Sequence, residues 1–312
     1  MFVSNAALSS PPAQADGERK PMPVSSDGST LEQSELDKLS QPADSNLVPA
    51  TPPSKKRVDD GARHGEGMEA GGTEGIGTKS IFEPDGRTRS TTSWAPASAT
   101  VQMTYLNDAG DRVQFCTGFM ISPDTVATAG HCVYDLENDE WISGRGFLAF
   151  PGRDGVDSAP YGSCAAESFH AVDLLTEEGN REYDYGAVKL DCEVGTSTGT
   201  YGYFWQSDSL DDFRAVTRGY PADQEYGTQW SADDRIRETH DRQVFHRADT
   251  VGGQSGSPLY DWLDRCSGPC VMAVHAQGCR TDGEPCNDSD TPFTNHNYGP
   301  RITEEAYQFL QT

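Results

Sequence analysis

The segment GGQSGSP at residues 252–258 places Ser255 between glycines. A nucleophilic serine must lie on a turn that exposes its hydroxyl, with backbone N–H groups pointing at the oxyanion that develops during attack. Glycines on both sides permit that unusual backbone. Ordinary loops have the same composition, so the segment alone fits either a catalytic turn or a flexible connection.

A candidate general base lies upstream, in the segment TAGHC at residues 128–132. His131 follows a short apolar segment and precedes Cys132, which can anchor it. A base must be held rigidly beside the nucleophile, and this context provides for that. Metal binding or a structural role is the alternative for His131.

An acid that orients the base is the third requirement. Asp184 directly precedes the apolar segment 185–190, whereas Glu182 and Asp191 do not have this position at its head. A carboxylate at the start of an apolar strand can be buried enough to orient an imidazole. We therefore prefer Asp184, and an exposed carboxylate at a strand end is the alternative.

The order of the three candidates adds information that none of them has alone. His131, Asp184 and Ser255 occur in the order His, Asp, Ser, which is the chymotrypsin order. Subtilisins have the order Asp, His, Ser, and α/β-hydrolases have Ser, Asp, His. The sequence thus predicts a serine endopeptidase with this triad, in which the backbone N–H groups of Gly253 and Ser255 form the oxyanion hole.

The sequence pattern predicts that short strands position these residues. Apolar or β-branched segments are separated at short intervals by Pro, Gly, Asn and Asp, a pattern typical of an all-β sandwich or barrel. A helix is expected near the C-terminus, where Thr303 can cap and acidic residues follow. The expected strands are 100–106, 112–121, 125–128, 185–190, 215–219 and 271–275.

Composition separates the chain into two parts. Residues 1–79 are rich in Pro, Ser, Gly, Asp and Glu with Phe2 as their one aromatic residue, a composition that predicts disorder. After residue 79 there are 37 acidic residues against 16 Lys and Arg, so about −21 of the formal charge of −25 lies there. This charge argues against nucleic-acid binding, and no apolar run reaches the length of a membrane-spanning helix.

From residue 80 onward the sequence resembles the bacterial glutamyl endopeptidases, trypsin-like peptidases that cut after Glu. The matching segments lie in the same order over more than two hundred residues. They are DGRTR (85–89), CTGFMI (116–121), TVATAGHCVYD (125–135), YDYGAVKL (183–190), GYP (219–221), GTQW (227–230), GGQSGSP (252–258), CSGPC (266–270), AVHAQG (273–278) and RIT (301–303).

This resemblance implies the fold. It implies two antiparallel β-barrels of chymotrypsin type with the triad in the cleft between them, followed by the C-terminal helix. The first barrel would span residues 80–195 and the second residues 196–312. Residues 1–79 would be a mostly disordered propeptide, and Ala13-Gln14-Ala15 fits either the end of a signal peptide or a plain tail.

The resemblance also implies substrate-binding residues. His275 matches a family histidine that helps to hold the P1 carboxylate, and Thr250 matches the hydroxyl residue of the same pocket. Imidazole and hydroxyl groups supply the donors that a carboxylate needs. A core histidine is the alternative for His275. The five remaining histidines are expected on the surface: His64, His170, His240, His246 and His296.

Processing is expected between Lys79 and Ser80, where the segment that resembles mature family members begins. The freed α-amino group would lie near the P1 carboxylate. A basic run at residues 55–57 is a rival first cleavage site, and a passive tail that needs no processing is the alternative.

The eight cysteines all follow residue 115, and their even number favours disulfides in an oxidising compartment. The family pattern implies the pairs Cys116–Cys132 and Cys266–Cys270. Of the three ways to pair the other four, loop proximity favours Cys164–Cys192 and Cys279–Cys286.

The predicted function is therefore that of a secreted, monomeric serine endopeptidase that cuts proteins or peptides after Glu more readily than after Asp. No metal, cofactor, nucleic-acid partner or membrane is expected. Two alternatives remain: a peptidase of the same fold with another P1 preference, and an inactive binding homologue. The intact triad and the GQSG segment argue against the second.

Overall fold

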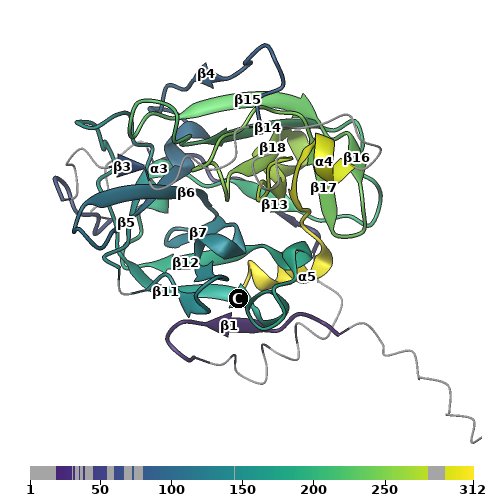
Figure 1. Ribbon diagram of the computed structural model, residues 1–312, viewed down its shortest axis with the longest axis horizontal. Helices are drawn as coiled ribbons and strands as arrows, with labels where there is room; N and C mark the ends of the chain where they lie inside the picture. Colours follow the sequence, from purple (N-terminus) through teal and green to yellow (C-terminus); the bar gives the residue numbers. More distant parts are fainter. Residues whose placement is uncertain are drawn as a thin grey trace, which may run out of the picture.

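The structure is a computed structural model that describes residues 19–29, 31, 35, 38, 45–54, 60–66, 72–73, 80–143, 145–279 and 292–312. Its architecture is almost entirely β (Figure 1), with one large sheet built mainly from the N-terminal half and further sheets built mainly from the C-terminal half. The all-β class predicted from the strand pattern is confirmed.

The first sheet has the strand order β1-β11-β12-β7-β6-β5-β10, and β3 pairs in parallel with β6. The other pairings in this sheet are antiparallel, as between β6 and β7, where Phe119 lies opposite Ala127. The strands are β1 (Pro23–Ser25), β3 (Gly72–Thr73), β5 (Thr100–Leu106), β6 (Arg112–Met120), β7 (Thr125–Thr128), β10 (Leu148–Pro151), β11 (Ala166–Val172) and β12 (Gly186–Leu190). A separate hairpin consists of β8 (Tyr134–Asp135) and β9 (Glu140–Trp141).

The second half forms a seven-stranded sheet in the order β2-β13-β19-β18-β14-β15-β4 and a three-stranded sheet in the order β16-β17-β20. The strands of the larger sheet are β2 (Leu47–Val48), β4 (Thr88–Arg89), β13 (Gly202–Phe204), β14 (Arg214–Gly219), β15 (Trp230–Arg235), β18 (Pro258–Leu263) and β19 (Gly268–Val274). Those of the smaller sheet are β16 (Glu238–Thr239), β17 (Gln243–His246) and β20 (Asn297–Pro300).

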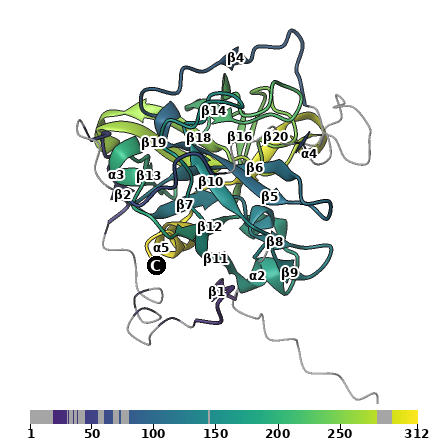
Figure 2. The same ribbon diagram turned by 90° about the vertical axis from the view of Figure 1, so that its left-hand side faces the viewer.

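The described helices are short. In the C-terminal helix, Thr303 is the N-cap, and its hydroxyl accepts a hydrogen bond from the Ala306 N–H at 3.2 Å, as its sequence predicts. This helix returns to the first sheet (Figures 1 and 2). There Phe309 packs on Tyr185. The helices are α2 (Asp173–Thr176), α3 (Gly195–Thr198), α4 (Pro292–Asn295), α5 (Glu304–Phe309), and the 3₁₀ helices η1 (Ala97–Ala99), η2 (Gly130–Cys132), η3 (Arg181–Tyr183) and η4 (Asp264–Cys266).

A continuous hydrophobic core joins the two halves. It contains Phe119 and Val126 from the first sheet together with Tyr260 and Val271 from the second, all of them buried. Strands whose β-branched and aromatic side chains fit a pleated surface supply most of it. Because the core is shared, the residues of β7, β12 and β19 keep fixed positions relative to one another, and these strands lead directly into the site.

Three short strands come from the first 79 residues. Composition predicts disorder here, yet β1 adds to the edge strand β11, β2 to β13, and β3 to β6. Arg19 also forms an ion pair with the buried carboxylate of Asp173 at 2.5 Å. These described segments are ordered because exposed sheet edges offer backbone hydrogen-bond partners that a solitary polar segment lacks.

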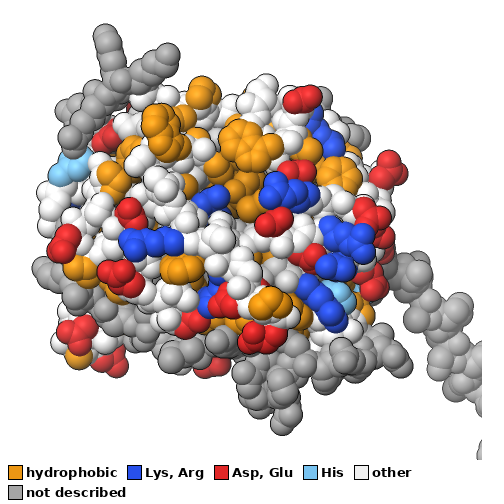
Figure 3. Space-filling model, turned by 90° about the horizontal axis from the view of Figure 1, so that it is seen from above, with side chains coloured by type: hydrophobic (Ala, Val, Ile, Leu, Met, Phe, Trp, Pro, Cys, Tyr) orange, Lys and Arg blue, Asp and Glu red, His pale blue; other side chains and the backbone are white. Residues whose placement is uncertain are grey.

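Figure 3 shows the face that carries β4 and β15, on which acidic and basic side chains are interspersed with hydrophobic ones. Several of these charges form ion pairs, such as Arg214 with Asp233 at 3.3 Å and Arg89 with Asp154 at 3.1 Å. In the described part of the chain, no helix combines the length and the hydropathy needed to span a membrane.

Candidate active site

His131 and Asp184 meet although 53 residues separate them. His131 lies in η2, directly after β7, and Asp184 follows η3 and precedes β12. Because β7 and β12 are paired antiparallel neighbours, the end of one strand lies beside the start of the other. The Nδ1 of His131 is 2.9 Å from Oδ2 of Asp184, and the backbone N–H of His131 donates to Oδ1 at 2.8 Å.

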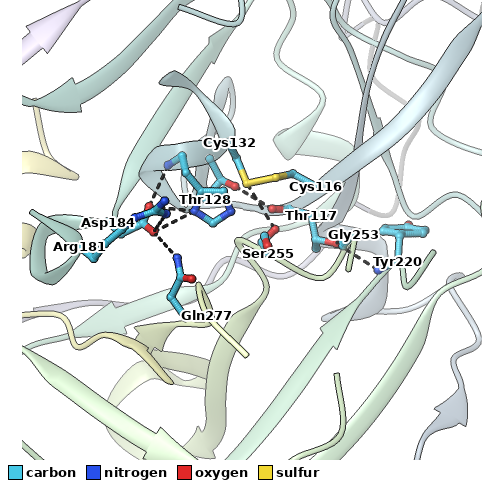
Figure 4. The surroundings of a disulfide bond; sticks show 11 residues. Cys116, Thr117, Thr128, Cys132, Arg181, Asp184, Tyr220, Gly253, Ser255 and Gln277 are labelled. Carbon is cyan, nitrogen blue, oxygen red and sulfur yellow. Dashed lines mark hydrogen bonds and ion pairs between the residues drawn. A yellow bond between two sulfur atoms is a disulfide. The ribbon is translucent and has the colours of Figure 1, made fainter. Parts of the chain in front are cut away.

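Two further side chains contact the same carboxylate (Figure 4). Arg181 donates to Oδ2 of Asp184 at 3.3 Å, and the Gln277 amide donates to the same oxygen at 3.1 Å. Asp184 is fully buried, which by itself would raise its pKa, but the interactions with His131 and Arg181 outweigh burial and lower the pKa to about 2. The carboxylate is therefore ionised and fixes the orientation of the imidazole.

Ser255 lies on a turn that requires glycine at two places. Gly253 and Gly256 have φ of +92° and +85°, and a Cβ on Gly256 would approach the Thr117 carbonyl oxygen to 2.1 Å. Thr117 holds this turn, because its hydroxyl donates to the Gly253 carbonyl at 2.8 Å and its N–H donates to the Ser255 carbonyl at 2.8 Å. In the described structure the N–H groups of Gly253 and Ser255 have no hydrogen-bond partner, as an oxyanion hole requires.

The Cys116–Cys132 disulfide connects the segment of His131 to strand β6 (Figure 4). Cys132 adjoins His131, and Cys116 adjoins Thr117, which holds the turn of Ser255. The bond therefore links the segment of His131 to the residue that holds the turn of Ser255. Cys164–Cys192 and Cys266–Cys270 are also present as expected, whereas the expected Cys279–Cys286 pair includes Cys286, which lies outside the described residues.

A cavity of about 210 Å³ opens beside His131 and Ser255. Thr250 and His275, the two residues predicted for the P1 pocket, both line it. The Thr250 hydroxyl accepts a hydrogen bond from the Asn297 amide at 2.9 Å, which leaves its own proton free to donate. The complete lining is His131, Arg181, Thr250, Val251, Gly252, Ser255, His275, Ala276, Gln277 and Gly278, without an Asp or Glu among these described residues.

His246 stands behind this pocket, and its position corrects the expectation that it lies on the surface. Its ring centroid is 5.4 Å from that of His275, and both side chains are buried. Neither ring nitrogen of His246, nor Nδ1 of His275, has a hydrogen-bond partner among the described residues. Burial lowers the pKa of His246 to about 4 and that of His275 well below its usual range, so both rings are neutral near pH 7.

Ser80 pairs through its backbone with Thr250, a residue of the pocket lining. Its N–H donates to the Thr250 carbonyl at 2.9 Å, and the Thr250 N–H donates back at 3.1 Å. The neighbouring Asp249 turns away from the cavity, because its carboxylate accepts hydrogen bonds from the N–H groups of Phe82 and Gly86, both at 2.7 Å. Lys79, the other residue of the expected cleavage site, lies outside the described residues.

Metal ligation does not fit the donor groups in the described structure. Two clusters have three side chains of ligand type within reach of one another, and each contains both sulfurs of a disulfide. A disulfide sulfur cannot become the thiolate that binds zinc. The third member of the first cluster is His131, whose Nδ1 is engaged by Asp184.

Comparison with known proteins agrees with this geometry. Residues 116–266 match the model of the trypsin-like peptidase domain. The chain is 36% identical over 236 residues to a glutamyl endopeptidase of Bacillus licheniformis, covering 74% of this chain and 68% of the relative. It is also 36% identical to a Bacillus subtilis protein called an extracellular metalloprotease, covering 74% of this chain and 69% of that protein.

Solved structures share the fold. A Glu endopeptidase aligns with a TM-score of 0.58 at 24% identity, over 74% of this chain and 97% of its own. The protease Anisep from Arthrobacter nicotinovorans aligns with a TM-score of 0.52 at 19% identity, over 72% and 96%. The chain therefore belongs to the glutamyl endopeptidase family of trypsin-like serine peptidases, and it is a serine endopeptidase.

Proposed function

We propose that this protein is a secreted glutamyl endopeptidase that hydrolyses peptide bonds after Glu, and less readily after Asp. The observation that carries the proposal is the cavity in which Thr250 and His275 lie beside His131 and Ser255. Similarity to the glutamyl endopeptidase of Bacillus licheniformis supports the same specificity.

In the proposed mechanism, His131 takes the proton of Ser255 as its oxygen attacks the scissile carbonyl carbon. The N–H groups of Gly253 and Ser255 stabilise the resulting oxyanion. His131 then gives the proton to the leaving amine, which departs and leaves an acyl-enzyme. A water molecule, deprotonated by the same imidazole, releases the acid product and restores Ser255. Asp184 stabilises the imidazolium in both steps without taking up its proton.

Selection for an acidic P1 side chain follows from the donors that face the cavity. The Thr250 hydroxyl can donate because Asn297 already occupies it as an acceptor. His275 is neutral and lines the cavity, so its imidazole can donate a hydrogen bond to a carboxylate bound there. Among the described residues, no carboxylate lines the cavity to repel the substrate.

Processing before Ser80 would add a third donor. Ser80 is already held on Thr250 by two backbone hydrogen bonds, so cleavage of the preceding bond would leave its α-ammonium next to the pocket. An ammonium group there forms a charge-assisted contact with a P1 carboxylate. The chain before Ser80 would then be a propeptide. N-terminal sequencing of the active enzyme tests this, and a fully active form that starts well before residue 80 would contradict it.

Secretion and a monomeric state belong to the same proposal. Three disulfides among the described residues fit an oxidising compartment, and the Bacillus subtilis relative is named as extracellular. The active site is built within one chain and uses protein or peptide substrates.

Digestion of an unbiased peptide library by the processed protein tests the specificity. We expect cleavage after Glu and then Asp, and we expect His275→Gln to lower kcat/KM for Glu substrates about 100-fold, the cost of losing a hydrogen bond to a charged group. His240→Gln is the matched control, because His240 is exposed and outside the cavity.

Efficient cutting after Lys, Arg or Phe, with Glu ignored, would contradict the proposed specificity and identify a peptidase of the same fold with another preference. Absence of both cleavage and labelling of Ser255 by a fluorophosphonate would indicate an inactive homologue.

A further inference from the structure

Arg181 is the one cationic side chain among the described residues that line the catalytic cavity. It belongs to η3, three residues before Asp184. Its side chain is 48% exposed, whereas the carboxylate of Asp184 that it contacts is 0% exposed. The guanidinium is therefore accessible from the cavity, while the carboxylate that it contacts is buried. Figure 4 shows the two groups side by side.

Residues 276–278 form an edge of the cavity along which a substrate can bind, and this edge determines how the substrate passes Arg181. Gln277 is engaged on both backbone groups by Tyr298. The Ala276 carbonyl and both backbone groups of Gly278 have no hydrogen-bond partner in the described structure. An extended peptide can add to this free edge as a further strand, which is a common mode of peptide recognition.

Alternation of side chains then places the P2 residue. If the P1 side chain enters the pocket of Thr250 and His275, the preceding side chain of an extended peptide points to the opposite face. His131 and Arg181 lie side by side on the cavity wall, because both line the cavity and both contact the Asp184 carboxylate. The contact of Gln277 with Asp184 shows that the substrate edge adjoins this wall. The P2 side chain therefore comes within reach of the guanidinium.

The charges around Arg181 favour an acidic residue there. A guanidinium has five N–H donors, and in the described structure a single hydrogen bond uses them, to Asp184. The remaining donors can bind a carboxylate in a planar, bidentate manner. Arg181 also lies over the buried negative charge of Asp184, which would otherwise repel an acidic substrate. This arrangement stands out in a chain with a formal charge of −25.

We propose that Arg181 forms the S2 subsite and selects Glu or Asp at P2, so that the preferred substrates contain two consecutive acidic residues. The inference rests on the proposed cleavage after Glu and adds to it a second recognised position. It makes Arg181 a specificity-determining residue as well as a neighbour of the triad.

Arg181 has two proposed roles, support of Asp184 and recognition of the P2 side chain. A ratio of kcat/KM values between two substrates distinguishes them. Loss of its support for Asp184 would slow all substrates equally, whereas loss of S2 recognition would slow only those with an acidic P2 residue. The substrates are therefore matched peptides with P1 Glu that differ only at P2, which is Glu, its uncharged isostere Gln, or Lys. The measured quantity is the ratio of kcat/KM between P2 Glu and P2 Gln.

We expect a ratio of about five in the wild-type enzyme, the upper range for a half-exposed ion pair. Arg181→Gln should bring it to about one, and Arg181→Glu should make P2 Lys the best of the three. Arg181→Lys should keep a ratio above one. Arg214→Gln, which removes an exposed arginine of the second sheet, is the control and should leave the wild-type ratio unchanged.

An Arg181→Gln enzyme that retains the wild-type ratio, or a wild-type ratio of one, would overturn the inference. If none of the P1 Glu peptides is cut, the proposed function fails instead. The P2 series is then repeated with the P1 residue that the library identifies, and the same ratio decides the role of Arg181.

Discussion

Asp184 lies behind His131 and Gln277 of the cavity lining, whereas His246 lies behind His275, and the hydrogen-bonding groups in these two places are satisfied very differently. Asp184 accepts hydrogen bonds from the backbone and side chain of His131, from Arg181 and from Gln277. The two imidazoles are equally buried, yet three of their four ring nitrogens have no partner among the described residues. In the proposed function, the hydrogen bonds of the catalytic side are complete before substrate arrives, and those of the specificity side are not.

This difference teaches what each side is for. A group that orients the base must hold one geometry through the whole reaction, so every lone pair that could pull it elsewhere is occupied. A group that recognises a carboxylate gains most when its partner comes from the substrate, because an unpaired buried donor makes the unoccupied pocket unfavourable. The under-satisfied pocket therefore costs stability in the free enzyme and gains discrimination in the complex.

The largest expected effect comes from substitutions in the proposed triad. Ser255→Ala or His131→Ala should lower kcat about 10⁶-fold, because triad members act as a unit. Asp184→Asn should lower it about 10⁴-fold by favouring the wrong tautomer of His131. The measurement is steady-state hydrolysis of a P1 Glu peptide. Wild-type activity in a pure Ser255→Ala preparation would remove Ser255 from the mechanism.

The next largest effect concerns the buried imidazole of His246, whose cost in folding stability can be measured through the pH dependence of unfolding. His246 has its pKa lowered from 6.5 to about 4 by burial. The unfolded chain therefore binds a proton between pH 6.5 and 4 that the folded chain refuses, so the folded state loses stability as the pH falls through this window. The shift corresponds to about 3 kcal/mol.

His246→Leu should remove that loss, since an apolar side chain of similar volume needs no partners. The free energy of urea unfolding is compared at pH 7 and pH 4, in the Ser255→Ala background to prevent self-digestion. His240→Leu serves as the control, because the side chain of His240 is exposed. An equal loss of stability on acidification in His246→Leu and its parent would show that His246 is protonated in the folded state.

The strands differ in how well the sequence predicts their bounds. The strands β5 and β7 have the predicted bounds because β-branched, apolar and aromatic residues fill every position except Gln102. The strand β19 begins at Gly268, earlier than the predicted 271, because pairing with β18 extends the ladder through a Gly-Pro pair that reads locally as a turn. Local composition therefore predicts the bounds of β5 and β7, whereas the start of β19 depends on its pairing with another strand.

The site divides in the same way. The triad candidates have local signals, namely glycines around Ser255 and an apolar strand after Asp184, and their order adds a third. The sequence around His246 gives no local indication that this residue is buried. Its strand pairs with β20, which lies about fifty residues later in the chain. The contact of Gln277 with Asp184 joins residues 93 positions apart, and only the packing of the two halves creates it.

The smallest expected effect concerns Gln277, which belongs to both sides of the comparison. Its side chain supports Asp184 at 3.1 Å, while its backbone pairs with Tyr298 and forms the wall of the pocket. Gln277→Ala removes one donor from a carboxylate that keeps three others. We expect kcat to fall about 10-fold, the lower range for a hydrogen bond to a charged group.

The backbone of Gln277 is unchanged by the substitution, so the relative rates for P1 Glu and P1 Asp peptides should stay as in the wild-type enzyme. Selectivity and turnover are therefore measured together on the same pair of peptides. A fall in turnover with constant selectivity would place the Gln277 side chain wholly on the catalytic side. A changed Glu-to-Asp ratio would show that the amide also reaches the substrate, and the division between a completed catalytic side and an open specificity side would not hold at this residue.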